Sequence, residues 1–218
     1  MRFLLILLLG ALSAYAQALS FGVKGGVPIT GLIEAQPGAK ASYGSVTNRY
    51  LVGPTVEVGL PFGISLEVDA IYRHFRYTSE GGLPGLAYGY SHAAGHAWEF
   101  PLLAKHRFGK GSARPYVDAG VGWDAVGGSS ITTSVLIPPS LPPSPMTTTV
   151  KGGLGADNDV VFGLIIGGGI DVHTGLLHIS PEVRYTRWLS RHFTQTGFEY
   201  GTLASNQNQF EFSLGVTF

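Results

Sequence analysis

The sequence predicts an all-β protein: a closed, antiparallel, up-and-down eight-stranded transmembrane β-barrel. Apolar and polar residues alternate with a period of two along most of the chain, as expected for strands that present two different faces. The connections between the alternating segments are long and short in turn. Only 13% of the 218 residues are charged, about half the share in a typical soluble domain, and 32 are glycine.

The first residues have the pattern of an export signal. Arg2 precedes an apolar stretch at 3–12, and Ala14 and Ala16 provide the small residues of a cleavage site. About ten apolar residues are too few to span roughly 30 Å of hydrocarbon, which argues against a membrane anchor. We therefore expect residues 1–16 to be a signal peptide cleaved at about 16–18, and residues 19–218 to form the barrel domain.

Eight strands are expected after this signal. Each has about nine to fourteen residues, which is longer than most strands of soluble sheets and suits a tilted crossing of a bilayer. No segment shows the 3.6-residue period of an amphipathic helix. The predicted strands are 19–28, 49–60, 64–77, 96–108, 114–123, 160–172, 176–188 and 208–218.

The predicted connections alternate in length, as in barrels whose two rims face different compartments. The short turns are 61–63, 109–113 and 173–175. The long loops are 29–48, 78–95, 124–159 and 189–207. This arrangement places both ends of the barrel domain on the short-turn side. Within the longest loop, the proline-rich residues 138–145 favour a stiff, extended stretch.

The two faces of the predicted strands differ in charge. One face carries large apolar residues on all eight strands and is expected to be free of charge, whereas the other carries glycines, small polar residues and twelve charges. In a soluble barrel the apolar face would fill the centre, but a small lumen cannot hold so many large side chains. We expect the apolar face to contact lipid and the charged face to form a paired polar lumen. The predicted lumen residues are Lys24, Glu57, Glu67, Asp69, Arg73, Glu99, Lys105, Asp118, Asp171, Glu182, Arg184 and Glu211.

Aromatic residues near the strand ends predict the interfacial girdles of a transmembrane barrel. They are Tyr50, Tyr72, Tyr77, Trp98, Trp123, Tyr185 and Trp188. Three prolines oppose the strand assignment, because each removes a donor from the hydrogen-bond ladder. Bulges at Pro54, Pro101 and Pro181 would reconcile them with strands.

Strand number, loop alternation and polar lumen together resemble the small bacterial outer-membrane barrels, the superfamily of OmpX-like and OmpA-type transmembrane barrels. The resemblance covers residues 19–218. Its clearest segments are "SFGVKGGVP" at 20–28, "VGPTVEVGLPFGISLEVDAIYR" at 52–73, "RPYVDAGVGW" at 114–123, "SPEVRYTRW" at 180–188 and "FEFSLGVTF" at 210–218. It departs from full-length OmpA-type proteins because no periplasmic domain is expected after the eighth strand.

The resemblance implies location in the bacterial outer membrane, contact with its lipid, and insertion by the outer-membrane assembly machinery. In such families this machinery recognises a last strand that ends in an aromatic residue. The implied assembly signal consists of Phe210, Phe212, Leu214, Val216 and Phe218.

Two patterns favour catalysis or nucleotide binding, and both are weak. Lipid A deacylases use a His-x-Ser pair, and His178 and Ser180 have this spacing, but their parity places them in the lumen, away from the outer leaflet. The run Gly167-Gly168-Gly169 is not followed by a helix, so we expect it to let strands bend or pack closely.

Four histidines, His74, His92, His96 and His106, gather near strands three and four without a clear metal-ligand spacing. We therefore expect no catalytic site, no cofactor and no metal site. A net charge of zero and the absence of Lys/Arg runs argue against nucleic acid as a partner.

These observations predict a monomeric outer-membrane barrel with a plugged lumen and a structural or surface-interaction role. The four long loops are the expected place for an extracellular ligand. Two alternatives remain at this stage. One is a narrow passive channel for small solutes or ions, and the more remote one is a lipid-active enzyme.

Overall fold

In the computed structural model, the described residues are 19–31, 33–35, 42–44, 50–83, 87–136, 146–151, 160–192, 194–197 and 201–218. The expected signal peptide and the proline-rich residues 138–145 lie outside these ranges. The only helical turn within them is η1 (Pro61–Gly63), which is one of the expected short turns. No helix of the described part is long and apolar enough to cross a membrane.

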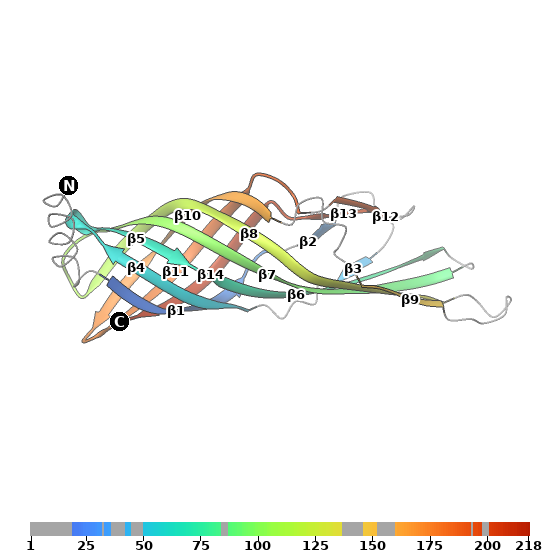
Figure 1. The fold of residues 1–218 in the computed structure, drawn as a ribbon, viewed down its shortest axis with the longest axis horizontal. Helices are drawn as coiled ribbons and strands as arrows, with labels where there is room; N and C mark the ends of the chain where they lie inside the picture. The colour runs from blue at the N-terminus through green and yellow to red at the C-terminus, as the bar shows by residue number, and fades with distance from the viewer. Residues whose placement is uncertain are drawn as a thin grey trace, which may run out of the picture.

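Eight antiparallel strands form a closed barrel, which confirms the predicted fold class (Figure 1). Around the barrel they are β1 (Leu19–Pro28), β4 (Leu51–Gly59), β5 (Ile64–Asp69) continued by β6 (Ile71–Leu83), β7 (Ala87–Arg107), β8 (Ala113–Leu136), β10 (Val160–Thr174), β11 (Leu177–Trp188) and β14 (Asn208–Thr217).

The barrel closes where the last strand pairs with the first. The register of β1 and β14 runs from the Gly22–Thr217 pair to the Pro28–Glu211 pair. Beyond it, Phe218 N donates to Phe21 O at 2.9 Å and Phe21 N donates to Phe218 O at 3.1 Å. Closure gives the backbone groups of both strands their partners, which a structure in hydrocarbon requires.

Two of the predicted long loops continue the barrel strands instead. At 78–95, β6 and β7 form one hairpin whose register is unshifted from Ile71–Glu99 to Leu83–Ala87. The pairing of β7 with β8 has one register shift, between Ala94 and His96. Along 124–159, β8 continues to Leu136 and pairs with β9 (Met146–Lys151). Both segments are rich in glycine, serine and threonine. An aligned antiparallel ladder accepts such residues, since each still supplies a backbone donor and acceptor.

The other two predicted long loops contain short strands. Residues 29–48 include β2 (Ile33–Ala35) and β3 (Ser42–Gly44), and residues 189–207 include β12 (Thr194–Gly197) and β13 (Gly201–Ser205). Strand β3 extends the β6–β7 hairpin, and β12, β13 and β2 form a separate three-stranded sheet. All four lie at the barrel end opposite the C-terminus (Figure 1). The expected division into a short-turn rim and a long-connection rim is therefore present.

The prolines are accommodated without the expected bulges. The registers of β1 with β4, and of β11 with β14, are unshifted at Pro54 and Pro181. Instead, the third barrel strand is interrupted at Ala70, between β5 and β6, where Pro54 and Pro101 flank it on the two neighbouring strands. Ala70 N donates to Pro54 O at 3.0 Å, but Pro54 has no N–H to return. A missing donor therefore interrupts a ladder here without changing its register.

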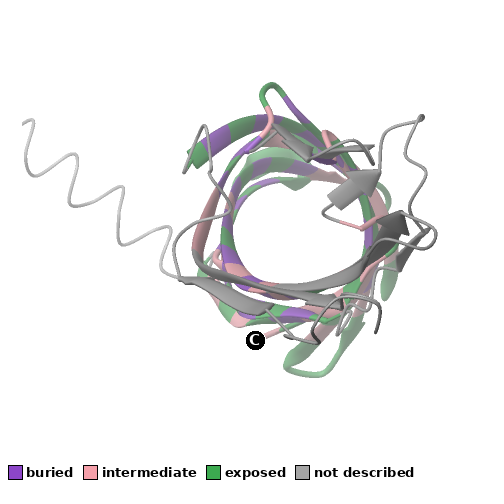
Figure 2. Cartoon of the chain, turned by 90° about the vertical axis from the view of Figure 1, so that its right-hand side faces the viewer, coloured by how far each residue is buried: buried purple, intermediate pink, exposed green. Residues whose placement is uncertain are grey.

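Where the side chains of the barrel strands are described, more buried and more exposed residues alternate, and both kinds follow each other around the ring (Figure 2). The outer face is apolar on all eight strands. Its exposed large residues include Leu19, Phe21, Val23, Val52, Val58, Leu66, Val68, Leu102, Val117, Val121, Phe162, Leu164, Ile166, Ile170, Ile179, Val183, Phe210, Phe212, Leu214 and Val216. A closed barrel with this outer face is the architecture with which β-proteins cross a bilayer.

Three residues depart from the predicted faces. Trp188 was expected in an aromatic girdle, but it is only 2% exposed and lies in the lumen, because it shares parity with Glu182 and Arg184. Arg76 and Arg187 occupy outward positions that were expected to be free of charge, and both are exposed. Arg187 lies one residue before the long-connection end of β11, and Arg76 lies four residues beyond Tyr72 in the same direction along β6.

The remaining girdle residues lie on the outer face where their side chains are described. Tyr72, Trp98, Phe100 and Trp123 form a row of ring contacts across β6, β7 and β8, with centroids 5.3 to 6.3 Å apart. Tyr185 contacts Phe210 at 4.7 Å. Tyrosine and tryptophan rings on the outer face of a barrel are typical of the interface between hydrocarbon and water.

Candidate functional site

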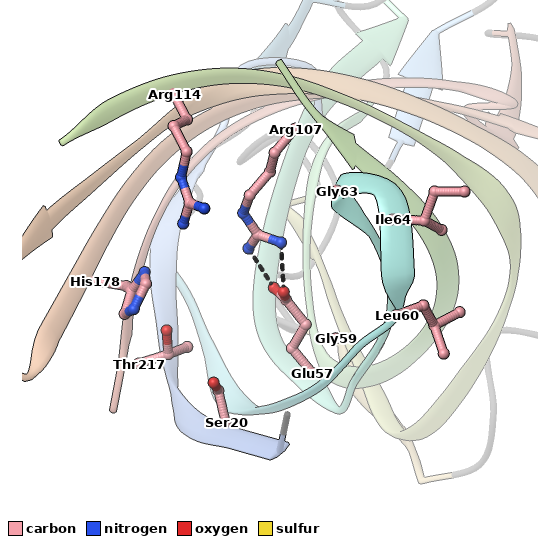
Figure 3. A pocket seen from close by; sticks show the side chains of 10 residues that line it. All are labelled: Ser20, Glu57, Gly59, Leu60, Gly63, Ile64, Arg107, Arg114, His178 and Thr217. Carbon is pink, nitrogen blue, oxygen red and sulfur yellow. Dashed lines mark hydrogen bonds and ion pairs between the residues drawn. The ribbon is translucent and has the colours of Figure 1, made fainter. Parts of the chain in front are cut away.

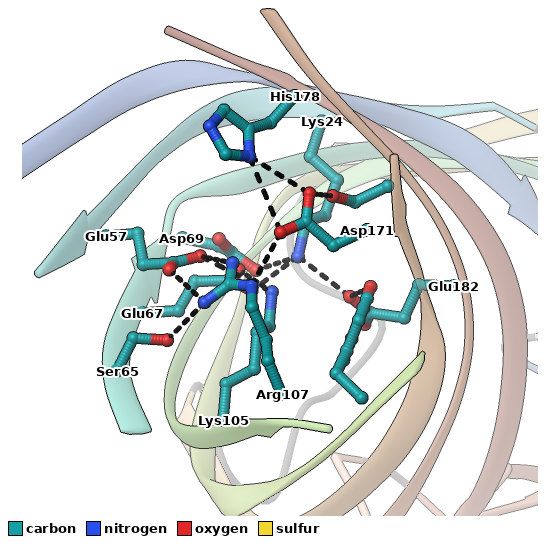
Figure 4. A network of polar contacts seen from close by, with 12 residues as sticks. Lys24, Glu57, Ser65, Glu67, Asp69, Lys105, Arg107, Asp171, His178 and Glu182 are labelled. Carbon is teal, nitrogen blue, oxygen red and sulfur yellow. Dashed lines mark hydrogen bonds and ion pairs between the residues drawn. The ribbon is translucent and has the colours of Figure 1, made fainter. Parts of the chain in front are cut away.

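The structure places all twelve predicted lumen residues inside the barrel, each 9% exposed or less. Residues at alternate positions of neighbouring strands point to the same side of the wall, which directs these side chains toward the barrel axis. They form a central cluster, a cluster at the short-turn mouth and a layer near the long-connection end. Figure 4 shows the first two.

Lys24, from β1, lies in the central cluster. Its Nζ contacts Glu67 Oε1 at 2.5 Å, Asp69 Oδ2 at 3.1 Å and Glu182 Oε2 at 3.3 Å. Lys105, from β7, pairs with the other oxygen of Glu67 and lies 4.4 Å from the centre of the Tyr116 ring. Charges that are this deeply buried are tolerated only when they are paired and hydrogen-bonded, as these are.

Arg184 connects opposite walls of the barrel. Its guanidinium, from β11, contacts Asp69 at 3.1 Å and Glu67 at 3.3 Å on β5, which lies four strands away in either direction. It also contacts Glu182 Oε1 at 2.7 Å on its own strand. The planar guanidinium suits such contacts because several of its donors can bind different carboxylates at once.

A second cluster lies at the short-turn mouth. Arg107 makes a two-pronged pair with Glu57, at 2.5 and 2.7 Å, and its Nε donates to Asp171 at 2.7 Å. Arg114 reaches the same Asp171 oxygen at 2.9 Å. A pocket of about 300 Å³ opens here (Figure 3). Its lining residues are Ser20, Glu57, Gly59, Leu60, Gly63, Ile64, Arg107, Arg114, His178 and Thr217.

A third layer of charged side chains lies in the lumen near the long connections. Arg73 contacts Asp124 at 2.8 Å and Glu99 at 3.4 Å, and His192 Nε2 lies 3.0 Å from Asp124. His192 follows β11 and its backbone N–H donates to Ser205 Oγ of β13 at 2.8 Å. These contacts place His192, at the start of the connection between β11 and β14, inside this end of the barrel.

Apolar side chains fill the lumen beside this layer. Leu51, Ile71, Phe75, Ala97, Leu103, Val161, Ile165 and Trp188 are all buried on inward positions. Trp188 Nε1 donates to Gln209 Oε1 at 3.1 Å, so its polar atom has a partner. The lumen is thus charged toward the short turns and partly apolar toward the long connections.

Two buried carboxyl groups have few partners among the described residues. Neither oxygen of Asp118 or of Glu99 makes a hydrogen bond, although Glu99 is near Arg73. Gly167 makes room for Asp118, because a Cβ at Gly167 would lie 2.5 Å from Asp118 Oδ1. The glycine run therefore allows close packing, as expected from sequence.

Sequence reasoning missed five members of the network: Arg107, Arg114, Tyr116, Asp124 and His192. Arg107 lies inside the predicted strand 96–108 with inward parity, so the alternation alone indicates it. Asp124 lies one residue beyond the predicted strand 114–123, and extending the alternation by one step gives it inward parity. Arg114 and Tyr116 have inward parity too, on a predicted strand. His192 lies in a connection and carries no periodic signal.

The His-x-Ser pair faces the lumen, as its parity predicted. His178 Nδ1 lies 3.1 Å from Asp171 Oδ1, and Ser180 Oγ donates to the same oxygen at 3.3 Å. His74 and His96 are paired across β6 and β7, whereas His106 lies at the other rim against Phe108. In the described part of the chain, no three His, Cys, Asp or Glu side chains are grouped to hold a metal ion.

The sequence matches no protein family and no curated protein sequence. Solved outer-membrane barrels are similar in overall structure. OprG from Pseudomonas aeruginosa is 15% identical, with 92% of this chain and 94% of that chain covered and a TM-score of 0.46. The corresponding values for Neisserial surface protein A are 14%, 91%, 94% and 0.43. For the N-terminal barrel domain of Pseudomonas aeruginosa OprF they are 15%, 92%, 96% and 0.41.

Proposed function

We propose that this chain is a monomeric outer-membrane barrel with a closed lumen. In this proposal, its role is structural or in surface interaction, and it is carried by the long connections. Export by the signal peptide at 1–16, contact with outer-membrane lipid and recognition of the last strand by the assembly machinery belong to the same proposal. Its main support is the ion-pair network, above all the contacts of Arg184 with Asp69 and Glu67 across the barrel.

The lengths of two strands support a role outside the bilayer. A tilted strand crosses the hydrocarbon with about 9–11 residues. Strand β7 has 21 residues and β8 has 24, about twice that number. Both extend toward the long-connection end, where the sheet order β3-β6-β7 and β8-β9 continues. The excess length provides a sheet beyond the membrane surface, which suits binding of an extracellular ligand.

A conductance measurement distinguishes a barrel with a closed lumen from a channel. Purified protein in planar bilayers is expected to give no steps above the baseline of protein-free membranes. Reproducible, ion-selective steps would contradict the closed lumen. A passage for cations is the second candidate function. Carboxylates outnumber cationic side chains in the lumen, and the two carboxylate oxygens of Asp118 make no hydrogen bond. It predicts steps whose cation selectivity falls in Asp118→Asn.

Shortening the β6–β7 hairpin tests the surface role. Ser79 and Ser91 are paired across this hairpin, so replacing residues 80–90 by Asn-Gly joins them through a two-residue turn. The shortened protein should insert and stay heat-modifiable on gels, while cells that display it should lose the surface binding of the full-length protein. If the shortened protein bound every surface ligand of the full-length protein with unchanged affinity, this hairpin would be excluded as the binding element.

The proposal is non-enzymatic. His178 and Ser180 both contact Asp171 rather than each other, and they lie at the short-turn end of the lumen. Phospholipid or lipid A turnover by the purified barrel, if it disappeared in Ser180→Ala, would instead establish an enzyme.

A further inference from the structure

Two histidines face each other beside the short-turn mouth, on the hairpin that joins β10 to β11. His173 and His178 are a cross-strand pair, and the hairpin turns through Gly175 and Leu176. Gly175 has a φ of +63°, a value that suits glycine at the first central position of a tight hairpin turn. The tight turn therefore holds the two histidines directly opposite each other on neighbouring strands.

The ring nitrogens of this pair point at one another. His173 Nδ1 lies 2.9 Å from His178 Nε2, and the ring centroids are 4.4 Å apart with an angle of 66° between the planes. His173 is exposed, and the side chain of His178 is 26% exposed and lines the mouth pocket. Both nitrogens are therefore reachable from water.

A buried carboxylate fixes the orientation of one ring. His178 Nδ1 lies 3.1 Å from Asp171 Oδ1, so donation from Nδ1–H leaves Nε2 with its lone pair directed at His173. Asp171 is itself held by Arg107 at 2.7 Å and Arg114 at 2.9 Å. An imidazole whose second nitrogen binds a carboxylate is the usual arrangement of a metal-ligating histidine.

We propose that His173 Nδ1 and His178 Nε2 form a binding site for a divalent transition-metal ion, Cu²⁺ above all, with water in the remaining positions. Neutral His173 presents its lone pair at Nδ1 when its proton is on Nε2, so binding needs a change of tautomer and no net proton release. Two protein ligands on an exposed rim make this a site of modest affinity, which adjoins the lumen network through Asp171 and is separate from the surface role.

The distance between the two nitrogens indicates which metal ion suits the site. Nitrogens 2.9 Å apart, each about 2.0–2.1 Å from a metal, subtend an angle of about 90°. Square-planar or tetragonal ions meet this angle, whereas tetrahedral Zn²⁺ prefers nitrogens farther apart. Cu²⁺ is also the strongest binder of nitrogen ligands among the divalent first-row ions.

Titration of the full-length, tag-free protein with Cu²⁺ tests the proposal. The folded barrel in detergent should bind one Cu²⁺ whose electron paramagnetic resonance spectrum shows coupling to two nitrogens. His173→Ala and His178→Ala should each weaken this binding at least tenfold and remove one coupled nitrogen. His106→Ala removes another histidine of the same rim and should bind like the wild type.

Two further measurements sharpen the result. Zn²⁺ should bind more weakly than Cu²⁺ in the wild type. Asp171→Asn keeps both imidazoles and should weaken Cu²⁺ binding by about tenfold to a hundredfold, through loss of ring orientation. Equal stoichiometry, affinity and spectrum in the wild type, His173→Ala and His178→Ala would overturn the site. Since both histidines lie on the exposed rim, unchanged heat-modifiable migration will show that these variants fold.

Discussion

The two faces of strand β11 have different surroundings: one belongs to the apolar outer wall and the other to the ion-pair network of the lumen. Val183 is 51% exposed among apolar residues of the outer wall, whereas the next residue, Arg184, is 1% exposed and contacts carboxylates from three strands. Strand propensity alone does not separate these positions, because valine suits a strand on either face. The difference teaches that parity, read together with barrel size, decides which residues meet lipid and which meet the lumen.

Loss of the Arg184 charge should have the largest effect. Arg184→Met leaves Lys24 as the one cation that Glu182, Asp69 and Glu67 share, and it removes the ion pair of Glu211. An uncompensated buried charge costs about 3–5 kcal/mol. We expect the free energy of unfolding to fall by this amount, measured by urea titration in lipid vesicles. Arg187→Met on the outward side of the same strand is the matched control and should change it by less than about 0.5 kcal/mol.

Trp188 tests the apolar part of the lumen. Trp188→Ala should lower the free energy of unfolding by about 3–5 kcal/mol, because it opens a cavity and leaves Gln209 without its indole donor. Trp98→Ala, in the outer girdle, should cost clearly less. Equal losses in the two variants would mean that Trp188 belongs to the girdle after all.

A charge on the outer face probes lipid contact and its depth. Val183→Arg, near the middle of β11, should cost about 2–4 kcal/mol, because lipid cannot solvate the guanidinium. Leu177→Arg, at the start of the same strand, should cost no more than about 1 kcal/mol. Equal and small costs at both positions, again from unfolding in vesicles, would place this face in water.

Substitution of Asp118 should have the smallest effect on the free energy of unfolding. Its carboxylate makes no hydrogen bond, so Asp118→Asn should change the free energy of unfolding by less than about 1 kcal/mol. Glu67→Gln disturbs Lys24, Lys105 and Arg184 and should cost several times more. A large loss in Asp118→Asn would reveal a partner for this carboxylate.

Strand number, closure and the twelve inward charges could be predicted from sequence, because period-two alternation and barrel size act on each strand locally. The outer ends of β6, β7 and β8 could not, since glycine and serine fit a loop as well as an established ladder. Trp188 lies near a strand end, which favours the girdle, but its inward parity places it in the lumen. The contact of His192 with Asp124 and the facing of His173 and His178 depend on three-dimensional arrangement, which no local pattern reports.

Accessibility of single cysteines along β14 tests the division into lipid and lumen faces most directly. The chain has no cysteine, so each substitution provides a unique site for a spin label. Labels at 210, 212, 214 and 216 should collide freely with oxygen dissolved in lipid, whereas labels at 211, 213 and 215 should be shielded from it. Oxygen accessibility should therefore alternate with a period of two. A flat profile, or one with the opposite phase, would contradict a barrel with lipid outside and a polar lumen inside.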